Sequence, residues 1–133
     1  MKKSKQFISV STDSSIIIWN YNSNHLWSLQ QILNGHSLIL QCLVINIIED
    51  IIINGSSDTT IKFCKKKKEW LRYQTITDHS KSVFGLSLNQ QQNRVVSCGE
   101  DKYILIIEQQ GYNQKWEVIK DINQKEWIQN MLY

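Results

Sequence analysis

His79, Ser97 and Asp101 are the three residue types of a nucleophilic triad and stand in one short segment of the chain. In a hydrolase of this type, the Asp orients the His, the His activates the Ser, and a nearby oxyanion site completes the chemistry. The surroundings of the serine do not fit this chemistry. Ser97 stands in the run Val95-Val-Ser-Cys98, which predicts a buried strand rather than a G-x-S-x-G turn. A small hydrolase that uses these three residues is therefore only an alternative interpretation.

The spacing between His and Asp recurs, which indicates internal repeats. His36 precedes Asp58 by 22 residues, the same separation as between the later pair. Three segments, 7–19, 52–64 and 95–107, align around their aspartates, which are 45 and 43 residues apart. A fixed period of this size is typical of solenoids and propellers.

Short apolar runs, bounded by Asn, Gln, Gly and Asp, divide the last two repeats into four strands each. The predicted strands cover 38–45, 50–54, 60–64 and 70–77, then 82–88, 94–97, 103–107 and 116–122. Runs of this length without helical periodicity predict β-strands. The sequence therefore predicts an all-β fold.

The repeat resembles the WD-repeat pattern, in which a period of ~40–45 residues holds a Gly-His pair, an aspartate turn and a strand that ends in Trp-Asp. Ile16-Ile-Ile-Trp19-Asn20 stands at the Trp-Asp position, and the later units have Cys64-Lys65 and Ile107-Glu108 there. The resemblance covers residues 6–122. It implies a partial β-propeller of about three blades, each of four antiparallel strands. We expect one domain over 1–133, with units near 1–35, 36–78 and 79–122 and with 123–133 as an extra strand.

The resemblance also implies a structural use for the His and Asp side chains. In WD repeats the loop His bonds the turn Asp and a Ser or Thr of the second strand, which in turn reaches the Trp of the third. The matching residues by position are Ser9, Asp13 and Trp19, then His36 and Asp58, then His79, Ser97 and Asp101. Asn54 replaces the serine in the second unit, and Trp is missing from the last two, so we expect weaker contacts there.

A propeller of this family implies a non-catalytic scaffold for other proteins, without a cofactor or a metal. By analogy with the family, the contacts lie in loops at one end of the central channel. These loops contain Thr12, Ser37, Ser57, Lys81, Ser82 and Glu100. The argument rests on the fold, and a fold does not dictate which partner is bound.

Three smaller features of the sequence are interpreted as structural. Lys65–Lys68 predicts a solvated hairpin loop, with a small patch for nucleic acid or another acidic surface as the alternative. Nucleic-acid binding is the weaker alternative, because the run has no interleaved aromatic residues. Three tryptophans recur at the start of the fourth strand and three cysteines lack C-x-x-C spacing, so we expect all six to be packing residues: Trp27, Trp70, Trp116, Cys42, Cys64 and Cys98.

The length and the termini set the remaining expectations. No run approaches the ~20 apolar residues of a membrane helix, and no signal-peptide core follows the basic start, so we expect a soluble protein of the cytoplasm or nucleus. Propellers close with typically 4–8 blades, and an isolated arc exposes two apolar faces. We therefore expect completion by further blades or by a second copy in a homodimer, with Glu126–Tyr133 aligned to a first strand.

Overall fold

The computed structural model describes residues 5–11 and 13–123, and these residues contain β-strands and no helix. The strands are β1 (Gln6–Val10), β2 (Ile16–Tyr21), β3 (Trp27–Leu33), β4 (Leu40–Ile45), β5 (Ile51–Ser56), β6 (Ile61–Lys66), β7 (Trp70–Ile76), β8 (Val83–Leu88), β9 (Arg94–Gly99), β10 (Tyr103–Gln109) and β11 (Trp116–Asn123). The all-β prediction is confirmed. The predicted strands of the last two units start within two residues of the observed ones. The segment 123–133 begins at the end of β11, and Glu126–Tyr133 lies outside the described residues.

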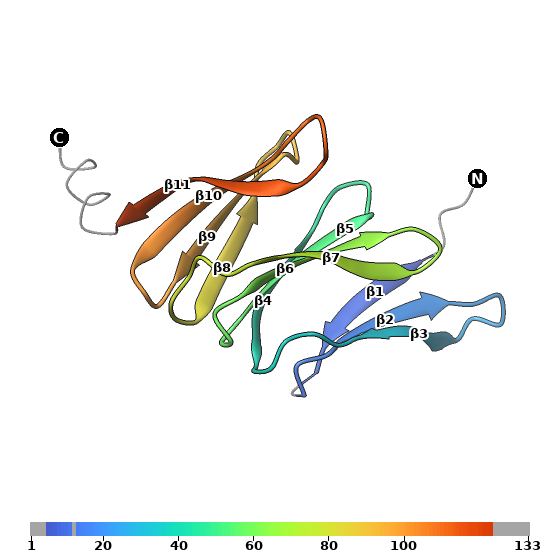
Figure 1. The fold of residues 1–133 in the computed structure, drawn as a ribbon. Helices are drawn as coiled ribbons and strands as arrows, with labels where there is room; N and C mark the ends of the chain where they lie inside the picture. Colours follow the sequence, from blue (N-terminus) through green and yellow to red (C-terminus); the bar gives the residue numbers. More distant parts are fainter. Residues whose placement is uncertain (1–4, 12, 124–133) are drawn as a thin grey trace.

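The strands form three antiparallel sheets that follow one another along the chain (Figure 1). The first sheet has three strands in the order β1-β2-β3, the second has β4-β5-β6-β7, and the third has β8-β9-β10-β11. Neighbouring strands are thus joined in sequence order, as short turns between antiparallel strands require. This architecture is that of partial propeller blades.

The same tight turn follows the aspartate of each repeat. Ser14, Thr59 and Lys102 all have positive φ, at 75°, 78° and 67°. Such a backbone is unusual for a β-branched residue such as Thr59, so something must hold it. The aspartate side chain does this: Asp58 Oδ1 accepts hydrogen bonds from the Thr60 backbone N–H at 3.0 Å and the Thr60 hydroxyl at 2.6 Å. The aspartates therefore fix the hairpins that shape each sheet.

Two apolar cores lie between neighbouring sheets. Ile16 and Ile18 of the first sheet pack with Ile52, Cys64 and Trp70 of the second. Across the next junction, the core consists of Ile51, Ile53, Ile61, Phe63, Ile76, Val83, Val95, Leu105, Ile107 and Trp116. Both cores are formed by alternate residues of neighbouring strands, as expected for sheets packed face to face.

A glutamine on each of the outer strands β3 and β7 also ties its sheet to the next one. Gln31 donates to the Trp70 carbonyl at 2.7 Å and accepts from the Trp70 N–H at 2.8 Å. Gln74 bonds the Trp116 backbone in the same two ways, with the N–H bond at 2.8 Å. Trp70 and Trp116 are each 2% exposed, whereas Trp27 is 45% exposed. The packing prediction is therefore confirmed for the two later tryptophans, whereas Trp27 packs against the rings of Phe7 and Tyr21 within its own sheet and stays partly exposed.

Candidate interaction surface

In the third sheet, His79, Ser97 and Asp101 are joined by hydrogen bonds. His79 lies in the loop between β7 and β8, and its Nδ1 is 2.9 Å from Asp101 Oδ2. Its Nε2 is 2.8 Å from the Ser97 hydroxyl on β9. A neutral imidazole satisfies both contacts, since Nδ1–H donates to the carboxylate and Nε2 accepts from the hydroxyl. We call this set, and its counterpart in the second sheet, a clamp.

The same geometry would suit a nucleophilic serine, but burial argues against that use. Ser97 is 0% exposed and His79 is 3% exposed. A substrate carbonyl must approach the serine Oγ closely, and neighbouring side chains cover this atom. The arrangement instead ties the loop before β8 to the turn after β9.

The second clamp contains an amide in place of the hydroxyl. His36 Nδ1 is 2.8 Å from Asp58 Oδ2, and His36 Nε2 contacts the Asn54 carboxamide oxygen. The His36 and Asp58 side chains are only 2% and 8% exposed. Asn54 thus keeps a contact with the ring at the position where a serine would stand, and the expectation that the second clamp is weaker stays a prediction. Cys64 stands at the position of the missing tryptophan and is buried.

The first sheet has only part of a clamp. Trp19 Nε1 donates to the Ser9 hydroxyl at 2.9 Å, so the structure brings these two residues together. Asp13 is exposed and bonds Ser15 and Ser11 rather than either of them. His25 is exposed and contacts the Tyr21 hydroxyl. Within residues 5–11 and 13–123, no histidine reaches Asp13.

The hydrogen bonds around each clamp aspartate outweigh the effect of its burial. Burial alone would raise the pKa of Asp58, but bonds from Thr60, His36 and the Ser37 N–H stabilise the carboxylate and hold its pKa at about 2. Burial also acts against Asp101, and bonds from the Ser80 N–H, His79 and the Tyr103 N–H lower its pKa below the ordinary range. Both aspartates therefore stay ionised in the folded protein at neutral pH.

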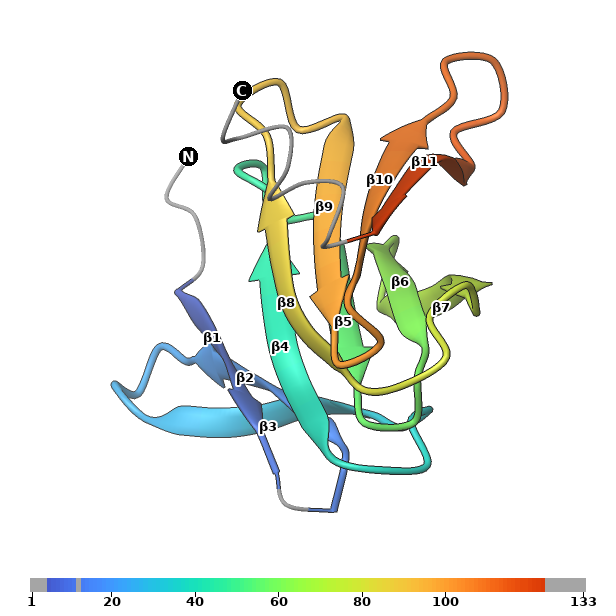
Figure 2. The same cartoon turned by 90° about the vertical axis from the view of Figure 1, so that its left-hand side faces the viewer.

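The loops predicted to contact partners lie at one end of the sheets, the lower end in Figure 2. Ser37 is exposed and its N–H donates to Asp58, and the half-buried Ser57 bonds the backbone of the same loop. In the third unit, the Glu100 N–H donates to the Ser82 carbonyl at 2.8 Å, and Lys81 is exposed beside them. Thr12 lies outside the described residues.

Two exposed apolar residues at this end were not predicted. Leu38 and Ile39 are 53% and 59% exposed, in the loop between β3 and β4. The predicted strand begins at residue 38 and includes them, but β4 begins at Leu40. Gly35-His36-Ser37 marks a loop in the sequence. The apolar Leu38 and Ile39 give no sign that this loop continues through them. We call Ser37, Leu38, Ile39, Lys81 and Glu100 the loop end.

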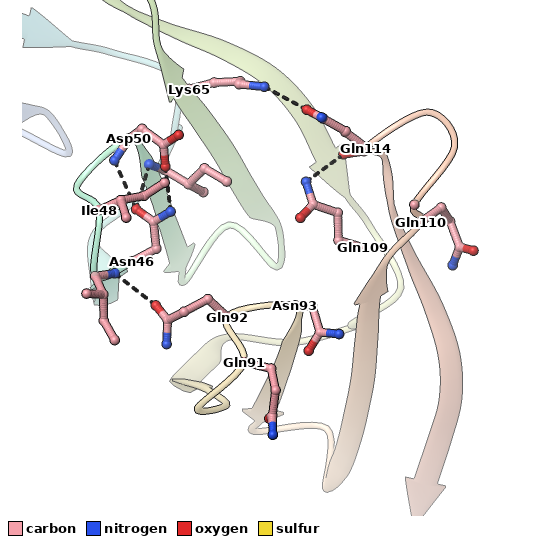
Figure 3. A pocket seen from close by; sticks show the side chains of 13 residues that line it. Asn46, Ile48, Asp50, Lys65, Gln91, Gln92, Asn93, Gln109, Gln110 and Gln114 are labelled. Carbon is pink, nitrogen blue, oxygen red and sulfur yellow. Dashed lines mark hydrogen bonds between the residues drawn. The ribbon is translucent and has the colours of Figure 1, made fainter.

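The opposite end of the second and third sheets contains a groove of about 620 Å³ rich in side-chain amides (Figure 3). Gln92 accepts from the Ile47 N–H at 2.9 Å, and Lys65 Nζ donates to Gln114 at 2.8 Å across the groove. The groove could not be predicted from the sequence, because its lining comes largely from turns of two sheets. Among the described residues that line it, Lys65 and Asp50 are the charged ones, and their charges are opposite.

The lysine run is not a simple loop. Lys65 and Lys66 belong to β6, are half-buried and bond Gln114 and Gln6, whereas Lys67 and Lys68 are exposed in the turn. The hairpin-loop prediction is therefore wrong for the first two lysines, because the strand extends through them. This division disperses the charge that a nucleic-acid patch would need.

The cysteines differ from one another in exposure. Cys64 is buried and Cys42 is half-buried, and burial raises the pKa of the Cys42 thiol to about 11. Cys98 is exposed, because it points to the open face of the third sheet, so the packing prediction is wrong there. Residues 5–11 and 13–123 bring no three His, Cys, Asp or Glu side chains together as a metal site would. They also form no helix long and apolar enough to cross a membrane.

A comparison with known families agrees with this geometry. The model of the WD domain, G-beta repeat, matches residues 70–108. Residues 70–108 are thus similar to a WD repeat. The matched segment begins with β7 of the second sheet and ends in β10 of the third, so it contains the whole clamp of His79, Ser97 and Asp101. WD repeats generally serve as non-catalytic platforms for protein interactions. No curated protein matches the chain.

Proposed function

We propose that this protein is a non-catalytic WD-repeat scaffold that binds other proteins through its loop end. The observation that carries the proposal is the use of His79, Ser97 and Asp101. These side chains are buried and bonded to one another inside the matched WD repeat, so they support the fold and leave the surface loops to act. In this proposal, units 1–35, 36–78 and 79–122 form one domain of a larger propeller or complex.

The composition of the loop end supports binding to a protein. Leu38 and Ile39 expose apolar surface beside Ser37, and the next loop adds the exposed Lys81 and Glu100. An apolar centre with a polar and charged rim is typical of protein interfaces. The clamps hold both loops in place, because Asp58 and Asp101 accept from the Ser37 and Ser80 N–H groups at 3.0 Å. Free thiols at Cys42, Cys64 and Cys98 suit a reducing compartment such as the cytoplasm or nucleus.

Photo-crosslinking from the two ends of the molecule tests this proposal. A photoreactive amino acid at Leu38 is expected to capture a specific partner in cells, and the same group at Gln110 in the opposite groove serves as the matched control. The combined change Ile39→Ser and Lys81→Ala should abolish capture from position 38 while the fold, measured by circular dichroism, is unchanged. Equal capture from both positions, or hydrolysis of a model ester that Ser97→Ala abolishes, would contradict the proposal.

A further inference from the structure

A second hollow, of about 670 Å³, lies along the outer edge of the second sheet, where that sheet meets the β10–β11 turn of the third. Five consecutive residues of β7, 71–75, form one wall, and the turn residues 113–115 stand opposite. Lys65 and Gln114 line both this hollow and the amide-rich groove, so the hydrogen bond between them stands where the two meet (Figure 3). We call the second hollow the edge cleft.

The charged residues that line the edge cleft all have the same sign. They are Lys65, Lys67, Lys115 and Arg72, and no acidic residue of the described chain lines it with them. None of the ion pairs among the described residues includes any of the four. Glu69 lies in the same turn as Lys67 but is not part of the lining. Positive charges without partners on both walls of one hollow favour an anionic occupant.

The edge cleft also has an apolar part. Leu71 and Tyr73 line it and are 49% and 37% exposed. The Tyr73 hydroxyl accepts from Trp116 Nε1 at 2.7 Å, and its ring meets Phe63 edge-on with centroids 6.4 Å apart. These contacts fix the tyrosine ring in the wall of the cleft. The occupant therefore needs an apolar side chain as well as negative charge.

The backbone of β7 offers hydrogen-bonding groups to the same cleft. Within the described residues β7 pairs only with β6, and the N–H and C=O of Trp70 face away from β6, because both bond Gln31. Backbone groups alternate in direction along an antiparallel strand, so those of Arg72 face outward too. The Arg72 guanidinium points elsewhere, since its Nη1 lies 2.7 Å from the place of a Cβ on Gly35. Arg72 therefore presents its backbone to the cleft.

We propose that the edge cleft binds a short acidic segment of a partner protein, held in extended conformation, with an apolar side chain between its carboxylates. The carboxylates pair with Lys65, Lys67 and Lys115. The apolar side chain packs on Leu71 and Tyr73, and the backbone of the segment bonds the outward groups of β7. This site goes beyond the proposed function and does not depend on it, because the cleft adjoins the amide-rich groove and not the loop end.

A nucleic acid is the other polyanion that lysines attract, and the edge cleft fits it less well. Proteins that bind single strands stack the bases on open aromatic faces. Tyr73 is the aromatic residue that lines the cleft, and its ring and hydroxyl are already held by Phe63 and Trp116. A peptide, in contrast, pairs its own backbone with both the N–H and the C=O of Arg72. The observations therefore favour a peptide.

Fluorescence anisotropy with the full chain tests the proposal. The probe is a labelled peptide of Glu and Asp residues around one central Leu, and the control probe replaces every acidic residue by its amide. We expect saturable binding of the acidic peptide alone, and weaker binding as the salt concentration rises, because exposed ion pairs are screened. The combined change Lys65→Gln and Lys115→Gln should weaken binding roughly tenfold, since it removes two of these pairs. Leu71→Ser should weaken binding by a similar factor at every salt concentration, because that contact carries no charge.

A matched variant separates the cleft from the overall charge of the protein. Lys102→Gln with Lys120→Gln removes two exposed lysines that do not line the cleft, so the net charge falls equally and binding should stay unchanged. Circular dichroism checks that each variant is folded. Equal binding of the acidic and amide peptides, no binding, or an equal loss in both lysine variants would overturn the proposal. So would tighter binding of a thymidine oligonucleotide that Lys65→Gln with Lys115→Gln abolishes.

Discussion

Asn54 and Ser97 illustrate at the scale of single residues how one position tolerates two chemistries. Both stand on the second strand of a repeat and both meet a histidine Nε2. The serine hydroxyl donates and accepts through one atom, whereas the carboxamide divides these roles between two atoms. Asn54 Nδ2 is accordingly buried without a hydrogen-bond partner among the described residues. In the second clamp, both ring nitrogens of His36 therefore have a partner, whereas Asn54 Nδ2 has none among the described residues.

The low pKa of Asp58 predicts a specific acid sensitivity. Because the folded-state pKa of about 2 lies below the ordinary 3.8, the stabilisation is fully present above pH ~4 and is lost as the pH falls through the folded value. Asp58→Asn should therefore be less stable than the wild type at neutral pH by roughly 2 kcal/mol, and this difference should shrink towards pH 2. Urea unfolding at a series of pH values measures it. Asp121→Asn is the control, and a constant difference across the range would show that the carboxylate charge is irrelevant.

The sequence predicted the clamp partners by spacing, and it could not predict their surroundings. The distance of 22 residues between His and Asp was enough to pair His36 with Asp58 and His79 with Asp101. The exposure of Cys98 depends on which sheet faces it, and a strand pattern of alternating residues does not contain that information. Leu38 and Ile39 are exposed because β4 begins at Leu40, two residues later than the predicted strand. The local sequence does not show this later start.

At the scale of the elements, the outer strands β3 and β7 make a contact with the next sheet that the repeat pattern did not predict. Gln31 on β3 and Gln74 on β7 each bond the N–H and C=O of the tryptophan that begins the next outer strand. Both glutamines follow an irregularity in strand pairing, which places their side chains toward the neighbouring sheet. The aligned position in the third sheet, Lys120, can donate but not accept, so the same double bond cannot be repeated there.

Removing one of these amides should loosen a whole strand. Gln74→Ala leaves the buried Trp116 N–H and C=O without their partner, which typically costs about 1–3 kcal/mol. We expect lower stability in urea and faster hydrogen exchange in β11 than in β9. Gln90→Ala, in the exposed turn between β8 and β9, is the control and should change stability only slightly. Uniform exchange in both strands would mean that the bridge does not hold β11.

At the scale of the whole molecule, the repeat period predicted where the strands lie. Which faces of the sheets are exposed depends on how the sheets pack against one another. The repeat register predicted strands within two residues of β7 to β11, because turns and apolar runs are local properties. The outer faces are a property of the assembly. Phe7 and Trp27 are exposed on the first sheet, as Val96 is on the third, although the aligned residues of the second sheet, Ile52, Trp70 and Ile53, are buried. No single repeat contains the sheet that would cover them.

The central claim is that the triad-like residues hold the fold together and do no chemistry. A double-mutant cycle on His79 and Asp101, followed by equilibrium unfolding in urea, tests it most directly. The account predicts that His79→Ala and Asp101→Ala each lower the free energy of unfolding by roughly 1–3 kcal/mol, since each leaves a buried partner unsatisfied. The double variant should lose clearly less than the sum, because both changes break one contact. Small, additive losses would contradict the claim and return these residues to the list of candidates for catalysis.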